Sequence, residues 1–361
     1  MANPTFSGMA KKLGPRNISS IYLFAIILVW AAIVVPDLFF TDSTLTAILN
    51  NTTVVGLVAI GLTLPLASGV YDLSIGNLVA FSGVVAGLLN TKLGLPLPIV
   101  ILLTLAVGAL VGLFNALWIV KLKIFSLIAT LGSGTILAGV TIGLSDNKQI
   151  VGISPDFLAF TSTQLFGKSL AVYYLFAAAL LLFFFLEATP AGRYIYATGG
   201  NAEAARLAGV KTNSYMTLSL VVGSIIAAFA GILQVSIVGV ASKDVGPGYL
   251  LPAFAAVFLG ATQFRGGRFN VWGTLVVIVT LAAGVKVLEL WTQMFWLDQV
   301  FYGSVLLIAV ALATAEGRIA FGKRRRPPET PEPESAAAVT TAEAQRDELR
   351  ERRPIAPREY A

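Results

Sequence analysis

Covalent chemistry has few candidate residues in this sequence. None of the 361 residues is cysteine or histidine, which excludes thiolate nucleophiles, imidazole bases and almost every transition-metal site. Two segments contain glycines in patterns that suggest a nucleotide loop, and both fail on spacing. Residues 166–169 contain Gly-Lys-Ser, but Ser162 stands where a phosphate loop needs its first glycine; residues 132–134 read Gly-Ser-Gly, but Leu137 replaces the third glycine of a dinucleotide turn. We therefore expect no catalytic residue, no metal site and no cofactor bound by this chain.

The most informative ionisable side chain is Asp72, which lies between two long apolar runs. A carboxylate in apolar surroundings is costly unless it caps a helix, pairs with another group or meets water. One interpretation is that Asp72 caps the helix that follows, accepting N–H groups near Ser74 and Ile75. The other is that Asp72 lines or gates a solute pathway. Aspartate at a helix start is common, which favours the cap, but the residue types leave both interpretations open.

Other polar side chains on apolar runs could bond either a passing solute or a neighbouring helix. A proline within a run also frees carbonyl groups that can turn towards a cavity. On these grounds the candidates for a pathway or gate are Asp72, Ser74, Asn77, Ser126, Thr130 and Pro252.

The composition places these residues in a membrane protein. Apolar residues make up 56% of the chain and charged residues only 12%, whereas a soluble domain carries about 25% charged residues. Apolar runs of about 17 to 25 residues recur, and each can cross a hydrocarbon core of about 30 Å as a helix. The net charge of +6 lies in short loops and a C-terminal run, which fits membrane topology and argues against nucleic-acid binding. We predict an all-α polytopic membrane protein in contact with lipid.

Charge, proline and glycine divide the apolar runs into about ten predicted transmembrane helices. The second and third are separated by only a short segment, and the eighth is short and contains Pro252, so eight or nine spans with a re-entrant piece would also fit. The predicted spans are 19–36, 48–68, 74–91, 98–120, 124–144, 171–188, 214–236, 249–264, 270–290 and 297–315.

Basic residues fix the expected orientation, because lysine and arginine in short loops remain on the cytoplasmic side. With both termini in the cytoplasm, the cations near Lys121, Arg193, Arg206 and Arg268 fall inside. The loop cations left outside are Lys92, Lys148, Lys168 and Lys243. This asymmetry supports an even number of spans in the cytoplasmic, or inner, membrane.

The domain organisation follows from these spans. We expect a cytoplasmic N-terminal segment at 1–18, a transmembrane domain at 19–320, and a tail at 321–361 that is too polar to bury a core and is therefore disordered and cytoplasmic. Two loops stand out by length within the transmembrane domain. One is external, at 145–170, and one is cytoplasmic, at 189–213.

The cytoplasmic loop contains a short predicted helix rich in alanine. Asn201 can cap this helix and Glu203 falls in its first turn. Such a helix can lie on lipid or cap its own bundle, or it can dock a soluble partner, for which small alanines allow close approach and Glu203 and Arg206 offer ionic orientation. The segment consists of Asn201, Ala202, Glu203, Ala204, Ala205, Arg206, Leu207, Ala208 and Gly209.

Residues 203–209 have the form E-A-A-x-x-x-G, which resembles the loop through which ABC importer permeases engage their ATPases. From about residue 45 to residue 313 the sequence resembles the ribose and xylose type of monosaccharide permease. The segments that carry this resemblance are SGVYDLSIGNLVAFSGVVAGLL at 68–89, FSLIATLGSGTILAGV at 125–140, GRYIYATGGNAEAARLAGV at 192–210, and FLGA at 258–261 with the Gly-Gly pair before Trp272.

The resemblance implies the rest of the system. A permease-like bundle of this family works with an ABC ATPase subunit, an extracytoplasmic sugar-binding protein and a second permease subunit, here expected as a homodimer. ATP and Mg²⁺ would bind the ATPase, and residues 201–209 would couple it to the bundle. The alternative function is an ion-coupled secondary transporter of a small polar solute, for which Asp72 is the candidate coupling group.

Overall fold

The computed structural model describes residues 19–263 and 267–315 of the protein. The predicted cytoplasmic segment at 1–18 and the predicted disordered tail at 321–361 lie outside these residues. Arg265, which contributed to the predicted orientation, also lies outside them.

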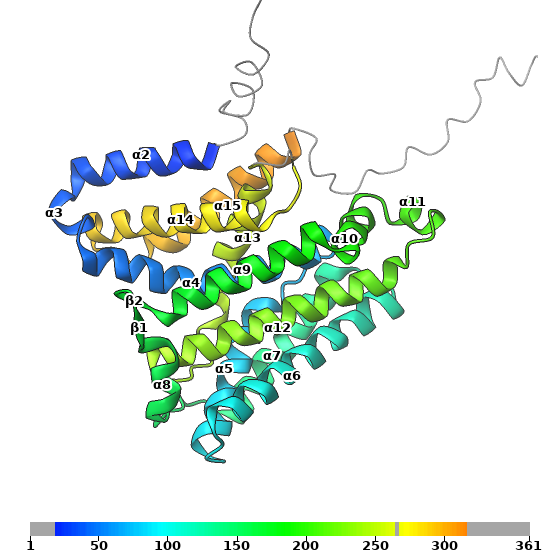
Figure 1. Ribbon diagram of the computed structural model, residues 1–361, viewed down its shortest axis with the longest axis horizontal. Coiled ribbons are helices and arrows are strands. Elements are labelled where there is room, and N and C mark those ends of the chain that lie inside the picture. The colour runs from blue at the N-terminus through cyan, green and yellow to red at the C-terminus, as the bar shows by residue number, and fades with distance from the viewer. Residues whose placement is uncertain (1–18, 264–266, 316–361) are drawn as a thin grey trace, which may run out of the picture. The chain divides into compact units, whose positions relative to one another are not determined.

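A helix lies at each of the ten positions where apolar runs predicted a span (Figure 1). Boundaries differ from the prediction by a few residues, most of all at the start of the second helix, which begins at Asp42 because Thr41 accepts the N–H of Thr44 as its cap. The ten helices are α2 (Ser19–Val34), α4 (Asp42–Ala67), α5 (Ile75–Thr91), α6 (Leu97–Ala116), α7 (Ser126–Leu144), α9 (Leu170–Ala188), α12 (Thr212–Val238), α13 (Gly246–Ala261), α14 (Val271–Thr292) and α15 (Leu297–Ala315).

Six helices in the described part of the chain are long and apolar enough to cross a membrane. These are α4, α6 with its extension to Lys121, α7, α9, α12 and α14. The other four, α2, α5, α13 and α15, are apolar but shorter in the stretches that qualify. The chain is therefore an α-helical multi-pass membrane protein.

Short elements connect these helices at their ends. They are α3 (Pro36–Phe39), the π-helical turn η1 (Leu117–Lys121), α8 (Pro155–Ser162), α10 (Pro190–Gly200), α11 (Ala202–Leu207), and the strands β1 (Gln164–Leu165) and β2 (Lys168–Ser169). The strands form an antiparallel hairpin in which Gln164 faces Ser169. The predicted external loop at 145–170 thus contains a helix and a hairpin, and the predicted cytoplasmic loop contains two helices.

The core lies between α4, α12, α13 and α14, whose apolar side chains form one large buried cluster. Helix α6 packs on α12 through Gly108 and Gly112, where the α12 backbone leaves no room for a larger side chain. Conversely, α6, α7 and α9 turn large apolar side chains outwards, and Leu102, Leu131 and Leu181 are each more than 60% exposed. In a protein of this class those faces suit lipid contact.

Helices α4 and α12 run antiparallel through the centre of the bundle. Near the end of α4, Ser68 Oγ lies 2.7 Å from Ser219 Oγ in the first part of α12. Gly61 and Gly223 also meet in the middle of the pair, each close to the carbonyl oxygen of the other. The helices that follow them also pack in matching ways: α12 contacts α5 and α6 as α4 contacts α13 and α14, and α5 packs on α7 as α13 packs on α15. The order α4–α5–α6–α7 is therefore repeated, inverted, by α12–α13–α14–α15.

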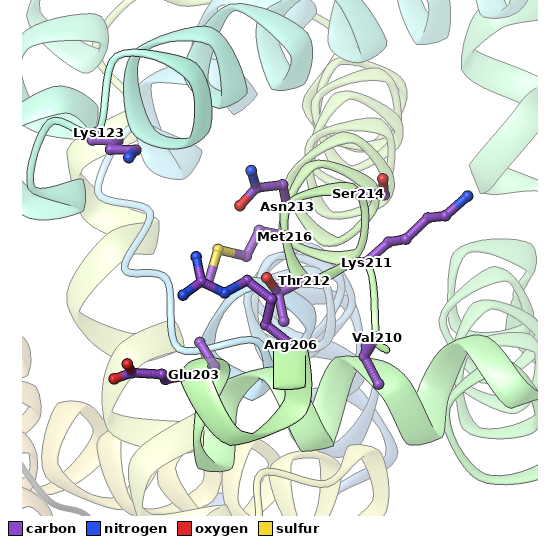
Figure 2. A pocket seen from close by; sticks show the side chains of 10 residues that line it. Lys123, Glu203, Arg206, Val210, Lys211, Thr212, Asn213, Ser214 and Met216 are labelled. Carbon is purple, nitrogen blue, oxygen red and sulfur yellow. The ribbon is translucent and has the colours of Figure 1, made fainter. Parts of the chain in front are cut away.

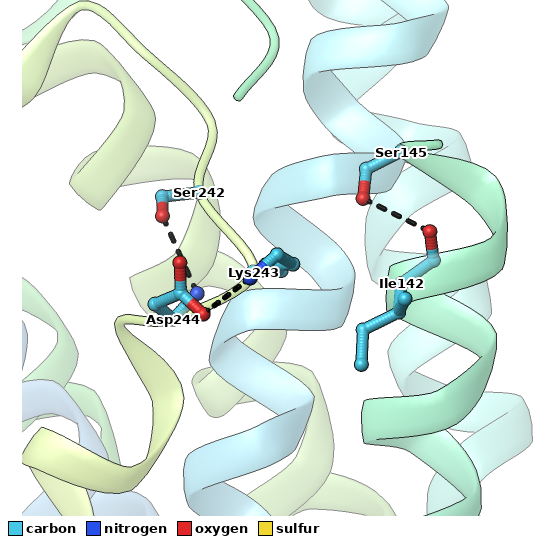
Figure 3. Close-up of polar contacts among 5 residues, drawn as sticks. All are labelled: Ile142, Ser145, Ser242, Lys243 and Asp244. Atoms are coloured by element: carbon cyan, nitrogen blue, oxygen red, sulfur yellow. Dashed lines mark hydrogen bonds and ion pairs between the residues drawn. The ribbon is translucent and has the colours of Figure 1, made fainter. Parts of the chain in front are cut away.

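The two halves share a detailed feature at the end of the central helices. Gly69 follows α4 with φ of +82°, and Gly239 follows α12 with φ of +81°, a left-handed conformation that glycine adopts without strain. Each glycine opens an irregular segment that leads to a shorter helix, at 69–74 and at 239–245. In the second segment Ser242 Oγ accepts the N–H of Asp244, and Lys243 pairs with Asp244 at 2.7 Å (Figure 3).

Candidate functional site

Helix α11 has the local structure that the sequence predicted. Asn201 Oδ1 accepts the N–H of Ala204 at 3.0 Å, so Asn201 caps the helix and Glu203 lies in its first turn. The chain leaves α11 at Gly209, whose φ is +86° and whose N–H bonds to the Arg206 carbonyl at 3.0 Å. The glycine of the E-A-A-x-x-x-G pattern is therefore the residue that lets the helix end and the chain turn towards α12.

Most of α11 points away from the bundle. Leu207 is 83% exposed, and Glu203, Ala204, Arg206 and Ala208 are also exposed, with Ala202 partly so. Ala205 is buried and fixes the helix against the protein. An apolar side chain this exposed on a short, capped helix has the character of a contact point for another molecule.

A cleft of about 630 Å³ lies beside α11. Figure 2 shows Arg206 extending into it towards Met216, with Lys123 on the facing segment. Three cations and a single carboxylate, Glu203, contribute to its lining, so the cleft is positively charged and suits an acidic side chain of a partner. The lining residues are Lys123, Ala202, Glu203, Arg206, Val210, Lys211, Thr212, Asn213, Ser214 and Met216.

Helix α10, which the sequence analysis did not anticipate, joins this loop to the bundle. Thr189 caps it by accepting the N–H of Gly192 at 3.2 Å. At its other end Gly199 packs directly on the carbonyl oxygen of Ala67, the last residue of α4. In between, Tyr196 donates a hydrogen bond to the Phe269 carbonyl at 2.8 Å, and the Arg268 guanidinium stacks 4.0 Å from the Tyr196 ring centre. Movement of the loop would therefore reach both α4 and the start of α14.

The segment after α4 contains Asp72, which is only 1% exposed. Asp72 Oδ1 accepts the N–H of Ser74 at 2.9 Å and the Ser74 hydroxyl at 2.5 Å. These bonds include the predicted contact with Ser74 but not one with Ile75; Ser74 is itself the N-cap residue of α5, and no side chain in the described part of the chain caps that helix. Among the described residues Asp72 Oδ2 has no hydrogen-bond partner, so the contacts with Ser74 satisfy only one of the two oxygens of this buried carboxylate.

Helix α7 holds the same segment through its hydroxyl side chains. Ser126 Oγ accepts the N–H of Tyr71 at 3.2 Å, and Thr130 Oγ1 accepts the N–H of Leu73 at 3.0 Å. These bonds satisfy backbone groups that have no helix or sheet partner. The structure thus brings together four of the predicted pathway candidates, Asp72, Ser74, Ser126 and Thr130.

Of the other two candidates, Asn77 borders this cluster and Pro252 lies elsewhere. Asn77 is in the first turn of α5, and its side chain lies against Gly134 of α7, next to Leu73 and Ser74. Pro252 lies inside α13, which continues through it, and lines a separate cavity. Asn115 of α6 is a residue whose role near Asp72 the sequence did not reveal: its amide donates to Ser74 Oγ at 2.8 Å. Only its position as a polar residue on an apolar helix could have drawn attention to it.

No cluster of acidic side chains in the described residues could hold a metal ion. The site is instead a set of packing and hydrogen-bond contacts, with an exposed loop at one end of a membrane bundle. This arrangement defines a multi-pass helical membrane protein that carries a capped, exposed helix at one end of its bundle.

Comparison with known proteins identifies the family. A model of the permease component of branched-chain amino acid transport systems matches residues 44–310, and the chain belongs to that family. The chain is 31% identical over 297 residues to the ribose import permease protein of Haemophilus influenzae, covering 81% of this chain and 90% of that protein. It is 31% identical to an autoinducer 2 import system permease protein of Photorhabdus laumondii, over 87% of this chain and 94% of the relative.

A third relative is the D-allose transport system permease protein of Escherichia coli, 27% identical over 81% of this chain and 89% of that protein. No solved structure matches the chain.

Proposed function

We propose that this protein is the membrane-spanning permease subunit of an ATP-binding cassette importer that carries a sugar, most simply a monosaccharide. The sugar would be delivered by an extracytoplasmic binding protein. ATP and Mg²⁺ would bind a separate ATPase subunit, and this chain would hydrolyse nothing. The proposal rests above all on α11, a capped and exposed helix with the E-A-A-x-x-x-G pattern beside a basic cleft of about 630 Å³.

The choice of sugar over amino acid comes from the relatives. The family description speaks of branched-chain amino acids, but the relatives above are named for ribose, autoinducer 2 and D-allose. Their similarity covers more than four fifths of this chain, so it includes the central helices as well as the loop. A polyhydroxyl cargo is the chemistry that ribose and allose share.

In this proposal all ten apolar helices cross the inner membrane and both termini face the cytoplasm. Residues 1–18 and 321–361 are cytoplasmic extensions, and 19–320 is the transmembrane domain. Helix α11 then lies on the cytoplasmic side, where an ATPase can reach it, and α8 with the β1–β2 hairpin lies outside. A second copy of the chain completes the permease pair.

Coupling would run through α10. When the ATPase closes on ATP, it moves α11, and α10 transfers that movement to the end of α4 and to residues 68–74, on which it packs. A switch of this kind requires two packings of the bundle with different affinities for the ATP-bound partner. Glycine at position 199 allows the close contact that such transfer needs.

The test is to assemble the chain with its ATPase and binding protein in liposomes. We expect sugar import that requires ATP, and a chain that hydrolyses no ATP alone. Glu203→Lys should weaken co-purification of the ATPase and lower import, because it reverses the charge on the exposed face of α11. Asp156→Lys, the same reversal on exposed α8, should leave co-purification unchanged.

Normal assembly and import by Glu203→Lys would refute the coupling role of α11. Import that persists without ATP and follows a proton or sodium gradient would instead favour an ion-coupled secondary transporter.

A further inference from the structure

A polar chamber of about 320 Å³ lies between five helices of the bundle. Its walls come from the first half of α4, the end of α12, the start of α13, the end of α14 and the start of α15. The polar residues that matter here are Asn50, Gln234, Tyr249, Glu289, Asp298 and Tyr302. Pro252, a candidate from the sequence, also lines this chamber, whereas Asp72 does not.

The chamber lies at the end of the bundle remote from α11. Helix α12 begins directly after α11, and the chamber residue Gln234 lies near its other end. The helix has 27 residues, which at about 1.5 Å per residue corresponds to about 40 Å. If α11 faces the cytoplasm, as proposed above, the chamber faces the external side, where a binding protein would release its cargo.

Two side-chain oxygen atoms of the chamber lack hydrogen-bond partners. Asn50 Oδ1 and Asp298 Oδ1 are inaccessible to solvent and have no hydrogen-bond partner among the described residues. Buried polar atoms are nearly always hydrogen-bonded, and leaving one unpaired is unfavourable. The amide oxygen of Asn50 only accepts hydrogen bonds, so its missing partner must be a donor such as a hydroxyl. The Asp298 carboxyl is also hydrogen-bonded to the Glu289 carboxyl, which requires a proton on one of the two.

The charges of the chamber limit its ligand further. Lys286 Nζ lies 3.0 Å from Glu289 Oε2 and balances that carboxylate, and the Asp298 carboxyl at the same wall is hydrogen-bonded to Glu289. One lysine beside a carboxyl pair that shares a proton leaves this wall close to neutral, so the chamber suits a neutral polar molecule.

The remaining walls also fit a sugar. Gln234 is 4% exposed and its amide lies beside the Tyr249 hydroxyl, so a polar pair is held inside the apolar bundle. The rings of Tyr249 and Tyr302 provide flat apolar surfaces of the kind that pack on the C–H face of a sugar ring. The volume is at the small end of the range of about 300–1,000 Å³ typical of ligand pockets, which suits a single monosaccharide unit.

We propose that this chamber is a sugar-binding subsite, which takes up one neutral monosaccharide released at the external side before it crosses the bundle. A hydroxyl group of the sugar donates to Asn50 Oδ1. This inference rests on the proposed function, because it identifies where the imported sugar binds in this chain.

The test uses the absence of cysteine in the natural sequence. Asn51→Cys places one thiol on the chamber lining, where a membrane-impermeant methanethiosulfonate reagent can be added from outside to the assembled importer. The probe is whichever of D-ribose, D-allose and D-xylose the wild-type complex imports. At saturating sugar we expect labelling to slow about tenfold, because only the unoccupied fraction reacts.

Phe166→Cys is the matched control. It places a thiol in the β1–β2 turn, at a position that is 91% exposed and outside the chamber. Its labelling rate should be the same with and without sugar. Equal labelling rates at Asn51→Cys with and without an imported sugar would show that the chamber does not bind the sugar, and would leave the proposed function intact. Failure of the wild-type complex to import any of the three sugars would overturn both.

A second variant separates sugar binding from energy coupling. Asn50→Leu keeps the size of the side chain and removes the unpaired acceptor, so import should fall about three- to tenfold through loss of one hydrogen bond. ATP hydrolysis stimulated by the binding protein should continue, because α10 and α11 are untouched. Import by Asn50→Leu at the wild-type rate would contradict the assigned role of Asn50 Oδ1.

Discussion

Gly199, near the end of α10, lies against the carbonyl oxygen of Ala67, the last residue of α4. A side chain at position 199 would overlap that oxygen and the backbone of Gly69 beyond it. The loop that carries α11 is therefore in rigid contact with the segment that contains Asp72. In the proposed importer this contact is the shortest route from the ATPase surface to the interior of the bundle.

Gly199→Ala should uncouple the loop that carries α11 from the end of α4. The added methyl group has backbone on its far side, which cannot move as a flexible side chain can, so the contact should open at a cost of about 1–3 kcal/mol. We expect the assembled complex to retain ATP hydrolysis while sugar import per ATP falls about fivefold or more, measured together in liposomes.

Gly200→Ala is the control for this substitution. Position 200 is adjacent, and a methyl group there would meet nothing within 4 Å. Its import per ATP should equal that of the wild type. If Gly199→Ala also behaves as wild type, the contact between α10 and α4 does not transmit the movement of the loop.

The sequence was sufficient to predict features set by local chemistry. Apolar length fixed the positions of the ten helices, and the cap at Asn201 and the turn at Gly209 follow from residue types that favour those conformations. Helix α10 escaped prediction because Gly192, Gly199 and Gly200 suggest a loop. Two of these glycines instead serve packing, with Gly192 against Leu186 and Gly199 against Ala67.

Features that depend on residues far apart in the chain could not be predicted. Asn115 bonds to Ser74 across 41 positions, and nothing near either residue indicates that contact. Asn50 and Gln234 line the same chamber because α4 and α12 are antiparallel. On the sequence alone, Gln234 was one polar residue on an apolar helix, equally suited to bonding a neighbouring helix.

The contact between the two inverted halves gives a stability prediction. A Cβ on Gly76 would lie 2.7 Å from the Gly246 carbonyl oxygen, and a Cβ on Gly246 would lie 2.7 Å from that of Gly76. Gly246→Ala should therefore separate α5 from α13 and lower the free energy of unfolding by about 1–3 kcal/mol.

The measurement is thermal unfolding of the purified chain in detergent. Gly132→Ala, whose methyl group would meet nothing within 4 Å, should leave the midpoint unchanged. An unchanged midpoint for Gly246→Ala would mean that the two halves separate at this contact without cost.

Substitutions at Asp72 can decide whether this residue holds the start of α5 or takes part in a solute pathway. Asp72→Asn keeps an oxygen that can accept the N–H and hydroxyl of Ser74, so we expect normal folding and import within about twofold of wild type. Asp72→Ala removes both bonds and should lower the free energy of unfolding by about 1–2 kcal/mol. Loss of import in Asp72→Asn with unchanged thermal unfolding would show that the charge itself is required.

The orientation of the bundle can be tested with two single cysteines. Leu207→Cys, on α11, and Phe166→Cys, in the β1–β2 turn, replace two highly exposed apolar residues, 83% and 91% accessible. Because of this high exposure, the reaction rate of each thiol should depend on the side of the membrane that it faces. The proposed topology places the first inside and the second outside, in agreement with the concentration of loop cations near Lys121, Arg193 and Arg206.

In intact cells an impermeant thiol reagent should therefore label Phe166→Cys and leave Leu207→Cys unmodified until the membrane is permeabilised. Labelling of Leu207→Cys in intact cells would place α11 outside, where no cytoplasmic ATPase can reach it. That result would remove the basis of the importer mechanism even though the helix positions and the family would stand.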